Sequence, residues 1–186
     1  MTYYERNLPH WHPDGASIFL TWRLFGSLPR NALGSIKNLH TDPRRQFLAA
    51  EALLDRPRSG PRWLADAKIA GLIEKTLERG EELRQYLLCA WVVMPNHVHV
   101  LLEPATSLST ITRGIKGVTA REANTALGRA GNPFWQDESF DRWIRNSAQF
   151  ERIRSYIEQN PVKAGLTKRQ EDWRWSSAAN RAILSK

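Results

Sequence analysis

The chain has 186 residues, of which 41% are hydrophobic and 25% charged, as is usual for a soluble globular domain. No apolar run reaches the roughly 20 residues of a membrane span, the N-terminus lacks a signal-peptide pattern, and the single cysteine excludes an internal disulfide. The formal net charge of +8 lies mostly in residues 113–186, with 14 basic against 8 acidic residues. We therefore expect a cytoplasmic protein with a polyanionic partner, nucleic acid first, and no membrane partner.

The first half of the chain predicts an arm, a strand and a helical segment. Residues 1–15 are rich in turn formers and are expected to be loop-like. Residues 17–25 predict a strand. The segment 31–85 is mostly helical, with one helix at 47–54 and a second from about 63 to 79.

The middle of the chain predicts a strand pair followed by a helix. Residues 85–94 and 97–103 are apolar strands, and the turn signal Pro95-Asn96 between them favours antiparallel pairing. A helix then runs from about 108 to 127 with Ser107 as its N-cap.

The last third predicts a further strand, a helix and a tail. The strand lies within 134–145, the helix runs from Ser147 to Asn160, where Pro161 discourages continuation, and a basic tail follows at 166–186. We expect a single α+β domain over 1–186, with an antiparallel sheet and helices on one face, as in ferredoxin-like folds.

Two histidines one residue apart form the most informative motif. Alternate residues of a strand share a face, so His97 and His99 project side by side. Two adjacent imidazoles can bind one divalent metal ion. The alternative is a pair of polar residues on a half-exposed strand.

The last predicted helix carries a second candidate group. Phe150, Ile153 and Ile157 define its apolar stripe, Tyr156 lies beside that stripe, and Asn160 follows Tyr156 by one turn. A phenol and a carboxamide therefore share a face. The alternative is a tyrosine that packs on the sheet and an asparagine that caps the helix end.

Two motifs together resemble a known family. The segments Met94-Pro95-Asn96-His97-Val98-His99-Val100-Leu101 and Ser155-Tyr156-Ile157-Glu158-Gln159-Asn160-Pro161-Val162-Lys163-Ala164-Gly165-Leu166 resemble the single-tyrosine HUH transposases of the IS200/IS605 class, and more closely the REP-associated tyrosine transposases (RAYTs). Segments 6–11, 134–136, 140–145 and 172–177 share the likeness, which spans nearly the whole chain. The resemblance implies the HUH nuclease fold.

The resemblance also implies roles for four residues. His97 and His99 would bind Mg²⁺ or Mn²⁺, Tyr156 would be the nucleophile, and Asn160 would supply a further metal ligand. Asn160 is favoured over the adjacent Gln159 because a spacing of four returns to the same helical face.

The implied function is a metal-dependent single-stranded DNA endonuclease and strand transferase. It would act on REP-like hairpins through a covalent 5′-phosphotyrosine, near the bacterial nucleoid. We favour a monomer; the alternative is a dimer that exchanges the tyrosine helix, as in the insertion-sequence relatives. Basic and aromatic residues are candidates for DNA contacts: Arg6, His10, Trp11, Arg113, Lys116, Arg121, Arg152 and Arg154.

Two other functions are compatible with the sequence. One is a domesticated hairpin-binding protein that keeps the site but rarely turns over. The other is a metal-dependent hydrolase that uses only the histidines; we disfavour it because no third strong ligand, such as a nearby Asp or Glu, is evident.

Overall fold

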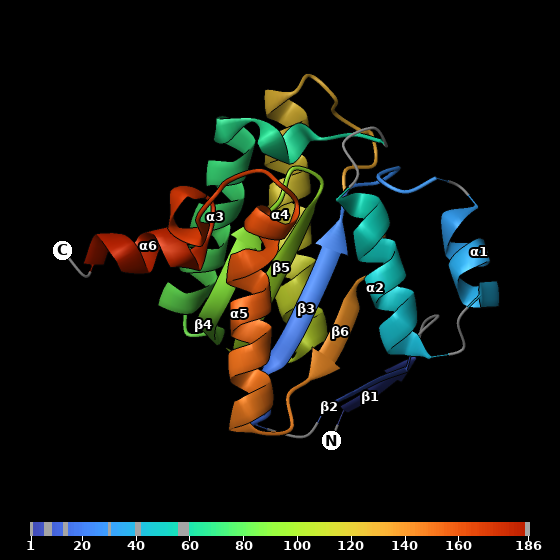
Figure 1. Ribbon diagram of the computed structural model, residues 1–186. Helices are drawn as coiled ribbons and strands as arrows, with labels where there is room; N and C mark the ends of the chain where they lie inside the picture. The colour runs from blue at the N-terminus through green and yellow to red at the C-terminus, as the bar shows by residue number, and fades with distance from the viewer. Residues whose placement is uncertain are drawn as a thin grey trace.

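The computed structural model describes residues 2–5, 9–12, 15–29, 31–39, 42–55 and 60–184 (Figure 1). The strands are β1 (Thr2–Glu5), β2 (Pro9–His12), β3 (Ile18–Arg23), β4 (Tyr86–Val93), β5 (His97–Pro104) and β6 (Phe140–Trp143). The α-helices are α1 (Ala32–Leu39), α2 (Pro43–Leu54), α3 (Ala67–Glu82), α4 (Leu108–Ala126), α5 (Ser147–Lys163) and α6 (Ser177–Leu184). Within these ranges no helix is long and apolar enough to cross a membrane.

Four strands form an antiparallel sheet in the order β4-β5-β3-β6. Strand β5 lies between β3 and β4, and its His99 is in register with Thr21 of β3. The tight connection from β4 is closed by the Met94 N–H, which donates to the His97 carbonyl at 2.9 Å. The α+β class and the predicted antiparallel pair are therefore confirmed.

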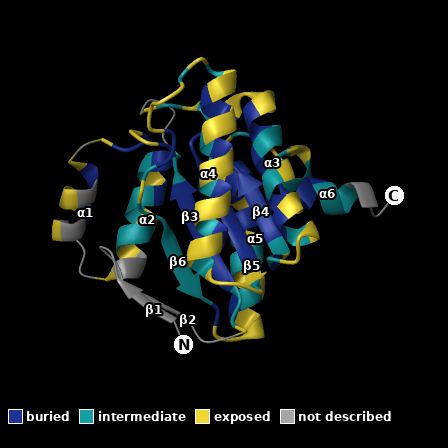
Figure 2. Ribbon diagram, turned by 180° about the vertical axis from the view of Figure 1, so that it is seen from behind, coloured by how far each residue is buried: buried dark blue, intermediate teal, exposed yellow. Residues whose placement is uncertain are grey.

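Helices cover both faces of this sheet, so the expectation of helices on one face is wrong (Figures 1 and 2). Leu20 and Val100 lie on the face that packs against α3 and α4, whereas Phe19 and Leu101 lie on the face that packs against α5 and Phe47 of α2. The reason is that the central strands are apolar at successive positions, so that both faces must be buried.

Residues 2–5 and 9–12 form two short strands, β1 and β2. Strands β1 and β2 pair antiparallel, with Thr2 opposite His12, where we had expected a loop. Tyrosine, threonine and tryptophan favour extended backbone, and this preference outweighs the turn formers around them. Of the predicted DNA contacts, Arg6 lies outside the described residues, and His10 and Trp11 are described only as members of β2.

Helix α5 continues past its expected end at Asn160 and includes Pro161. Proline lacks an N–H, which removes one hydrogen bond, but this loss falls in the last turn of the helix. Pro161 is buried there and its carbonyl accepts from the Leu166 N–H at 2.9 Å. Because the helix continues to Lys163, the backbone of Asn160 keeps regular helical geometry.

Candidate functional site

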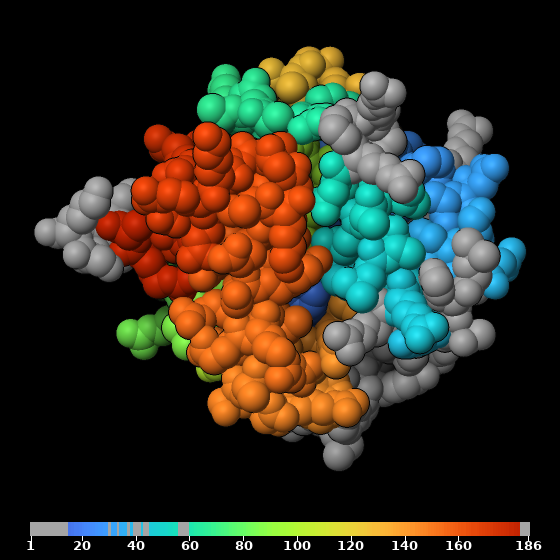
Figure 3. Space-filling model, viewed as in Figure 1, coloured from blue at the N-terminus to red at the C-terminus, as the bar shows by residue number. Residues whose placement is uncertain are grey.

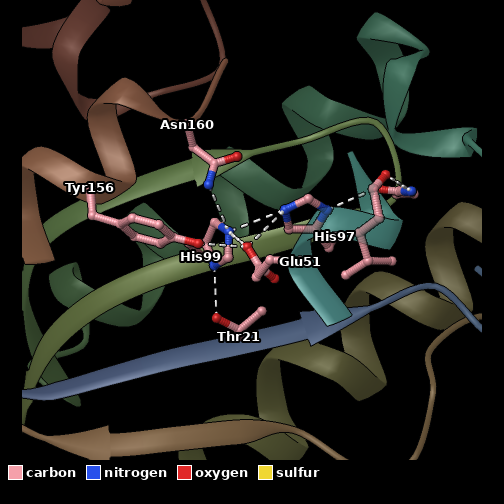
Figure 4. Close-up of polar contacts among 8 residues, drawn as sticks. Thr21, Glu51, His97, His99, Tyr156 and Asn160 are labelled. Atoms are coloured by element: carbon pink, nitrogen blue, oxygen red, sulfur yellow. Dashed lines mark hydrogen bonds and ion pairs between the residues drawn. The ribbon is translucent and has the colours of Figure 1, made fainter. Parts of the chain in front are cut away.

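His97 and His99 lie on the same face of β5 and are fully buried. Their Nε2 atoms are 3.1 Å apart. This placement is the one that the alternation of side chains along a strand predicts. Strand β5 is held extended because it has a paired neighbour on each side. They lie beneath α5 and α2, on the sheet face that carries Phe19 (Figure 4).

A chain of hydrogen bonds fixes the protonation of His97. The Asn96 amide nitrogen donates to the Leu54 carbonyl at 2.8 Å, which turns its Oδ1 toward His97 Nδ1 at 2.7 Å. Since Oδ1 only accepts, Nδ1 must carry the proton and Nε2 must present its lone pair to the site. His99 is held in a similar way by the Thr21 hydroxyl, 2.7 Å from its Nδ1. Such outer partners orient metal-binding imidazoles.

Helix α5 brings Tyr156 and Asn160 to the histidines. The Asn160 amide nitrogen lies 3.3 Å from His99 Nε2, and the Tyr156 and His99 ring centroids are 5.6 Å apart. The adjacent Gln159 is exposed and instead donates to Gln170 at 3.0 Å, so the four-residue spacing correctly favoured Asn160 as the residue that meets the histidines. All four sequence-predicted residues converge within one chain.

The structure adds Glu51 of α2, which the sequence analysis missed. Its Oε2 lies 2.8 Å from His99 Nε2, 3.8 Å from His97 Nε2 and 2.8 Å from the Tyr156 hydroxyl, which donates to it (Figure 4). The expectation that no acid is near the histidines is therefore wrong. The available signal was weak: Glu51 is the single acid of α2, four residues after Phe47 on an otherwise apolar helix face.

Burial and mutual charge set the protonation of the site. Burial raises the pKa of Glu51, but the two imidazoles and the hydrogen bonds from His99 and Tyr156 outweigh it and hold that pKa at about 2. Burial lowers the pKa of His97 to about 3, against the opposing effect of Glu51. Burial, and then the Glu51 carboxylate, raise the pKa of Tyr156 above its ordinary value. At neutral pH the site thus holds an ionised carboxylate, a neutral His97 and a neutral phenol.

Aromatic rings and one cation surround the nucleophile candidate. Phe19 and Phe47 meet the Tyr156 ring at 6.0 and 6.4 Å between centroids. The ammonium of exposed Lys163 lies 4.7 Å from the same ring. A narrow hollow separates α2 from α5 on the surface, with atoms of the segment around β3 at its floor (Figure 3). Tyr156 is half-buried, whereas the histidines behind it are closed to solvent.

The donor set suits a divalent metal ion. One ligand atom each of Glu51, His97 and His99 lies within 4.8 Å of the others. The carboxamide oxygen of Asn160 is buried and has no hydrogen-bond partner among the residues that the structure describes. Imidazole nitrogens with carboxylate and amide oxygens fit Mn²⁺ or Mg²⁺.

The predicted DNA contacts outside the N-terminal arm lie on two helices, α4 and α5. Arg113 and Arg121 are exposed on α4, on the opposite face of the sheet from the histidines. Lys116 of the same helix donates to the carbonyls of Gln136 and Asp137 at 2.6 and 2.8 Å, so it holds this loop. On α5, Arg152 is exposed. Its neighbour Arg154 pairs with Glu151.

Sequence and structure comparisons both relate this chain to transposases. The chain is 33% identical over 97 residues to the REP-associated tyrosine transposase of Escherichia coli (strain K12). That alignment covers 50% of this chain and 55% of the relative, so this chain matches about half of the relative's length.

A solved transposase structure shares the fold of this chain. A REP-associated tyrosine transposase bound to a REP hairpin superposes with a TM-score of 0.63 at 22% identity, over 98% of this chain and 86% of that one. A putative transposase from Deinococcus radiodurans matches with a TM-score of 0.45 at 17% identity, over 84% of this chain and 96% of that one, a similarity too low to carry an argument.

The family described as "Transposase IS200 like" matches residues 62–160, more than half of the chain. This segment holds the paired histidines of β5 and the Tyr156–Asn160 turn of α5. The resemblance drawn from the sequence to RAYTs and their IS200-like relatives is therefore confirmed, and the chain belongs to the IS200-like transposase family.

Proposed function

We propose that this protein is a metal-dependent endonuclease and strand transferase for single-stranded DNA, with Tyr156 as its nucleophile. One observation carries the proposal: the Tyr156 hydroxyl and His99 Nε2 each lie 2.8 Å from the same oxygen of Glu51. A phenol held beside a histidine pair has few structural uses, and it is the arrangement that phosphoryl transfer to tyrosine needs.

The reaction exchanges one phosphate ester for another. The phenolic oxygen of Tyr156 bonds to the scissile phosphorus while the bond from phosphorus to the 3′ oxygen breaks. The phenol loses its proton and the departing 3′ oxygen gains one, which leaves a 5′-phosphotyrosine and a free 3′-hydroxyl. Because the ester is conserved in the covalent link, the reverse attack by a 3′-hydroxyl rejoins the strand.

The chain's own residues prepare this attack. The hydrogen bond to Glu51 fixes the direction of the Tyr156 hydroxyl, and the ring packs against Phe19 and Phe47. The ammonium of Lys163 lies on the exposed side of the ring, where it can attract a phosphate. His97, His99 and Asn160 would hold Mg²⁺ or Mn²⁺. Such an ion, when bound, polarises a phosphate oxygen and stabilises the charge that develops on it.

The proposed substrate is a REP-like DNA hairpin with a single-stranded flank, acted on at the bacterial chromosome. Support comes from the REP hairpin bound to the structural relative and from the net charge of +8. Because Tyr156 meets the histidines within one chain, we propose that a monomer of a single domain is competent. DNA contacts are proposed from Arg113, Arg121, Arg152 and Arg154, with Arg6, His10 and Trp11 of the arm.

The test is covalent capture of a labelled hairpin oligonucleotide. With Mn²⁺ or Mg²⁺, the wild-type protein is expected to nick the oligonucleotide and to form an adduct that survives denaturing electrophoresis. Tyr156→Phe is expected to abolish the adduct. Tyr86→Phe is the matched control, since Tyr86 is buried on the other sheet face with its hydroxyl on the Leu77 carbonyl. An adduct that persists in Tyr156→Phe would exclude Tyr156.

A second candidate is hairpin binding without turnover. The observation that favours it is the full burial of both histidines beneath α2 and α5, which shields them from a phosphate. Hairpin binding that survives EDTA, with no cleavage in any divalent metal, would establish this function. Repeated cleavage without an adduct would instead indicate a metal-dependent hydrolase. Glu51 would then supply the third metal ligand that the sequence analysis did not find.

A further inference from the structure

Helix α2 contributes to the site from outside the family's matched segment. The match covers residues 62–160, whereas α2 ends at Leu54. The helix nevertheless lies against the histidine side of the sheet (Figure 1). Phe47 stacks on Phe140 at 4.3 Å between centroids, and one turn later Glu51 reaches His99. This chain therefore brings a carboxylate to the histidines on an element that lies outside the matched segment.

The polar contacts around His99 Nε2 cannot all be hydrogen bonds. That atom faces His97 Nε2 at 3.1 Å, Glu51 Oε2 at 2.8 Å and the Asn160 amide at 3.3 Å. An imidazole nitrogen carries either one proton or one lone pair, so it satisfies one of these neighbours at a time. His97 Nε2 presents a lone pair to the same point, because Asn96 fixes its proton on Nδ1.

Asn160 and Glu51 add buried side-chain oxygen atoms to the groups that meet near His99 Nε2. The Asn160 side-chain oxygen is buried without a hydrogen bond from any described residue. Rotation of this amide by 180° would exchange its oxygen for the nitrogen that now faces His99. Glu51 is 5% exposed, and in the part of the chain described it pairs with His97 and His99 but with no lysine or arginine. Burial of a carboxylate is costly unless it is paired with a cation or binds a metal ion.

We propose that Glu51 is a protein ligand of the divalent metal ion, together with His97 and His99. The inference rests on the metal site of the proposed function and extends it, because the ligand set gains an anionic oxygen from α2. A carboxylate adds charge and hard-oxygen character, and therefore tightens binding of Mn²⁺ or Mg²⁺. The bound ion joins α2 to β5 and so stabilises the helix that covers the site.

Mn²⁺ binding tests the proposal without reference to activity. Titration of the protein with Mn²⁺, followed by the loss of the free-ion electron paramagnetic resonance signal, gives the affinity. We expect Glu51→Gln, which keeps the size of the side chain, to weaken binding by about tenfold or more. Glu158→Gln is the matched control: Glu158 is also 5% exposed on a helix, but it accepts from Ser177 and pairs with Arg181. Its affinity for Mn²⁺ is expected to equal that of the wild type.

Hydrogen exchange supplies a second readout. Mn²⁺ is expected to slow amide exchange in α2 of the wild-type protein and of Glu158→Gln, and to leave α2 unchanged in Glu51→Gln. Circular dichroism establishes that the variants are folded. If Glu51→Gln is not, Glu51→Asp replaces it, with the same expected loss because the shorter side chain withdraws the oxygen.

The possible results distinguish the role of Glu51 as a ligand from the existence of a metal site at the histidines. Equal Mn²⁺ affinity in the wild type and Glu51→Gln, with binding lost in His99→Ala, would overturn the role of Glu51 and leave the histidine site intact. No Mn²⁺ binding by the wild type would overturn both.

Discussion

The Tyr156 hydroxyl lies 2.8 Å from Glu51 Oε2, although 105 positions separate the two residues in sequence. The contact joins α5 to α2 across the histidine face of the sheet and orients the phenol toward the proposed metal site. It also raises the pKa of Tyr156 beyond the effect of burial. In the metal-free protein Tyr156 is therefore a protonated and weak nucleophile, which explains why we expect cleavage only when a cation is present.

Removal of metal should leave a protein that is sensitive to acid. Burial lowers the pKa of His97 to about 3 from 6.5, so the unfolded chain binds more protons between these values. The free energy of unfolding should fall as the pH falls through this window, by up to about 1.4 kcal/mol per pH unit. Urea unfolding in EDTA at several pH values is expected to give a shallower dependence for His97→Gln.

The comparison reports His97 most directly above the ordinary Glu pKa of 4.5, because His97 also lowers the pKa of Glu51, which titrates below that value. Asp55 acts in the opposite direction in both proteins. Burial, and then the charge of Glu51, raise the pKa of Asp55 to about 6 from 3.8, so the folded state binds more protons between these values. Identical pH dependence in the wild type and His97→Gln would contradict the neutral, buried state of His97.

The Thr21 hydroxyl should tune metal binding through His99. Thr21→Val keeps the shape of the side chain but removes the 2.7 Å contact with His99 Nδ1, and we expect Mn²⁺ affinity to fall by about tenfold. Thr21→Ser retains the hydroxyl and should bind Mn²⁺ like the wild type. Equal losses in both variants would point to packing rather than to the hydrogen bond.

Asn160 and Gln159 should behave differently. Asn160→Ala removes the amide next to His99 and is expected to lower both Mn²⁺ affinity and adduct yield by about tenfold. Gln159→Ala removes only the contact of an exposed side chain with Gln170 and should change neither. The reverse result would assign the ligand to Gln159.

Arg152 offers a test of DNA contacts on α5. If its exposed guanidinium pairs with a phosphate, Arg152→Ala should weaken hairpin binding and reduce the slope of log affinity against log salt by about 0.7 to 0.9. Arg79→Ala on α3 is the control, since Arg79 pairs with Glu82 and was not predicted to contact DNA. An unchanged slope in Arg152→Ala would exclude that contact.

Local sequence patterns predicted much of the site. The period of two placed His97 and His99 on one strand face, and the period near four placed Asn160 with Tyr156 on one helix face. Their convergence was expected only through the family resemblance, since no local pattern specifies the packing of α5 on β5.

The missed features depend on contacts distant in sequence. Glu51 precedes His97 by 46 positions and reads locally as one acid in an ordinary amphipathic helix; its role depends on how α2 packs. Helices on both sheet faces were missed because the order of the elements favoured a ferredoxin-like layout, with helices on one face. On the second face, His97, His99 and Thr21 are buried because they satisfy one another and because α2 and α5 cover them.

Mass spectrometry of the protein–DNA adduct tests the central claim most directly. Trypsin should release Tyr156 on the peptide from Ser155 to Lys163, which contains no other tyrosine. After nuclease trimming, the account predicts a nucleotide linked through its 5′ phosphate to Tyr156 on this peptide. A nucleotide on any other residue, or full cleavage of the hairpin with this peptide unmodified throughout the reaction, would contradict it.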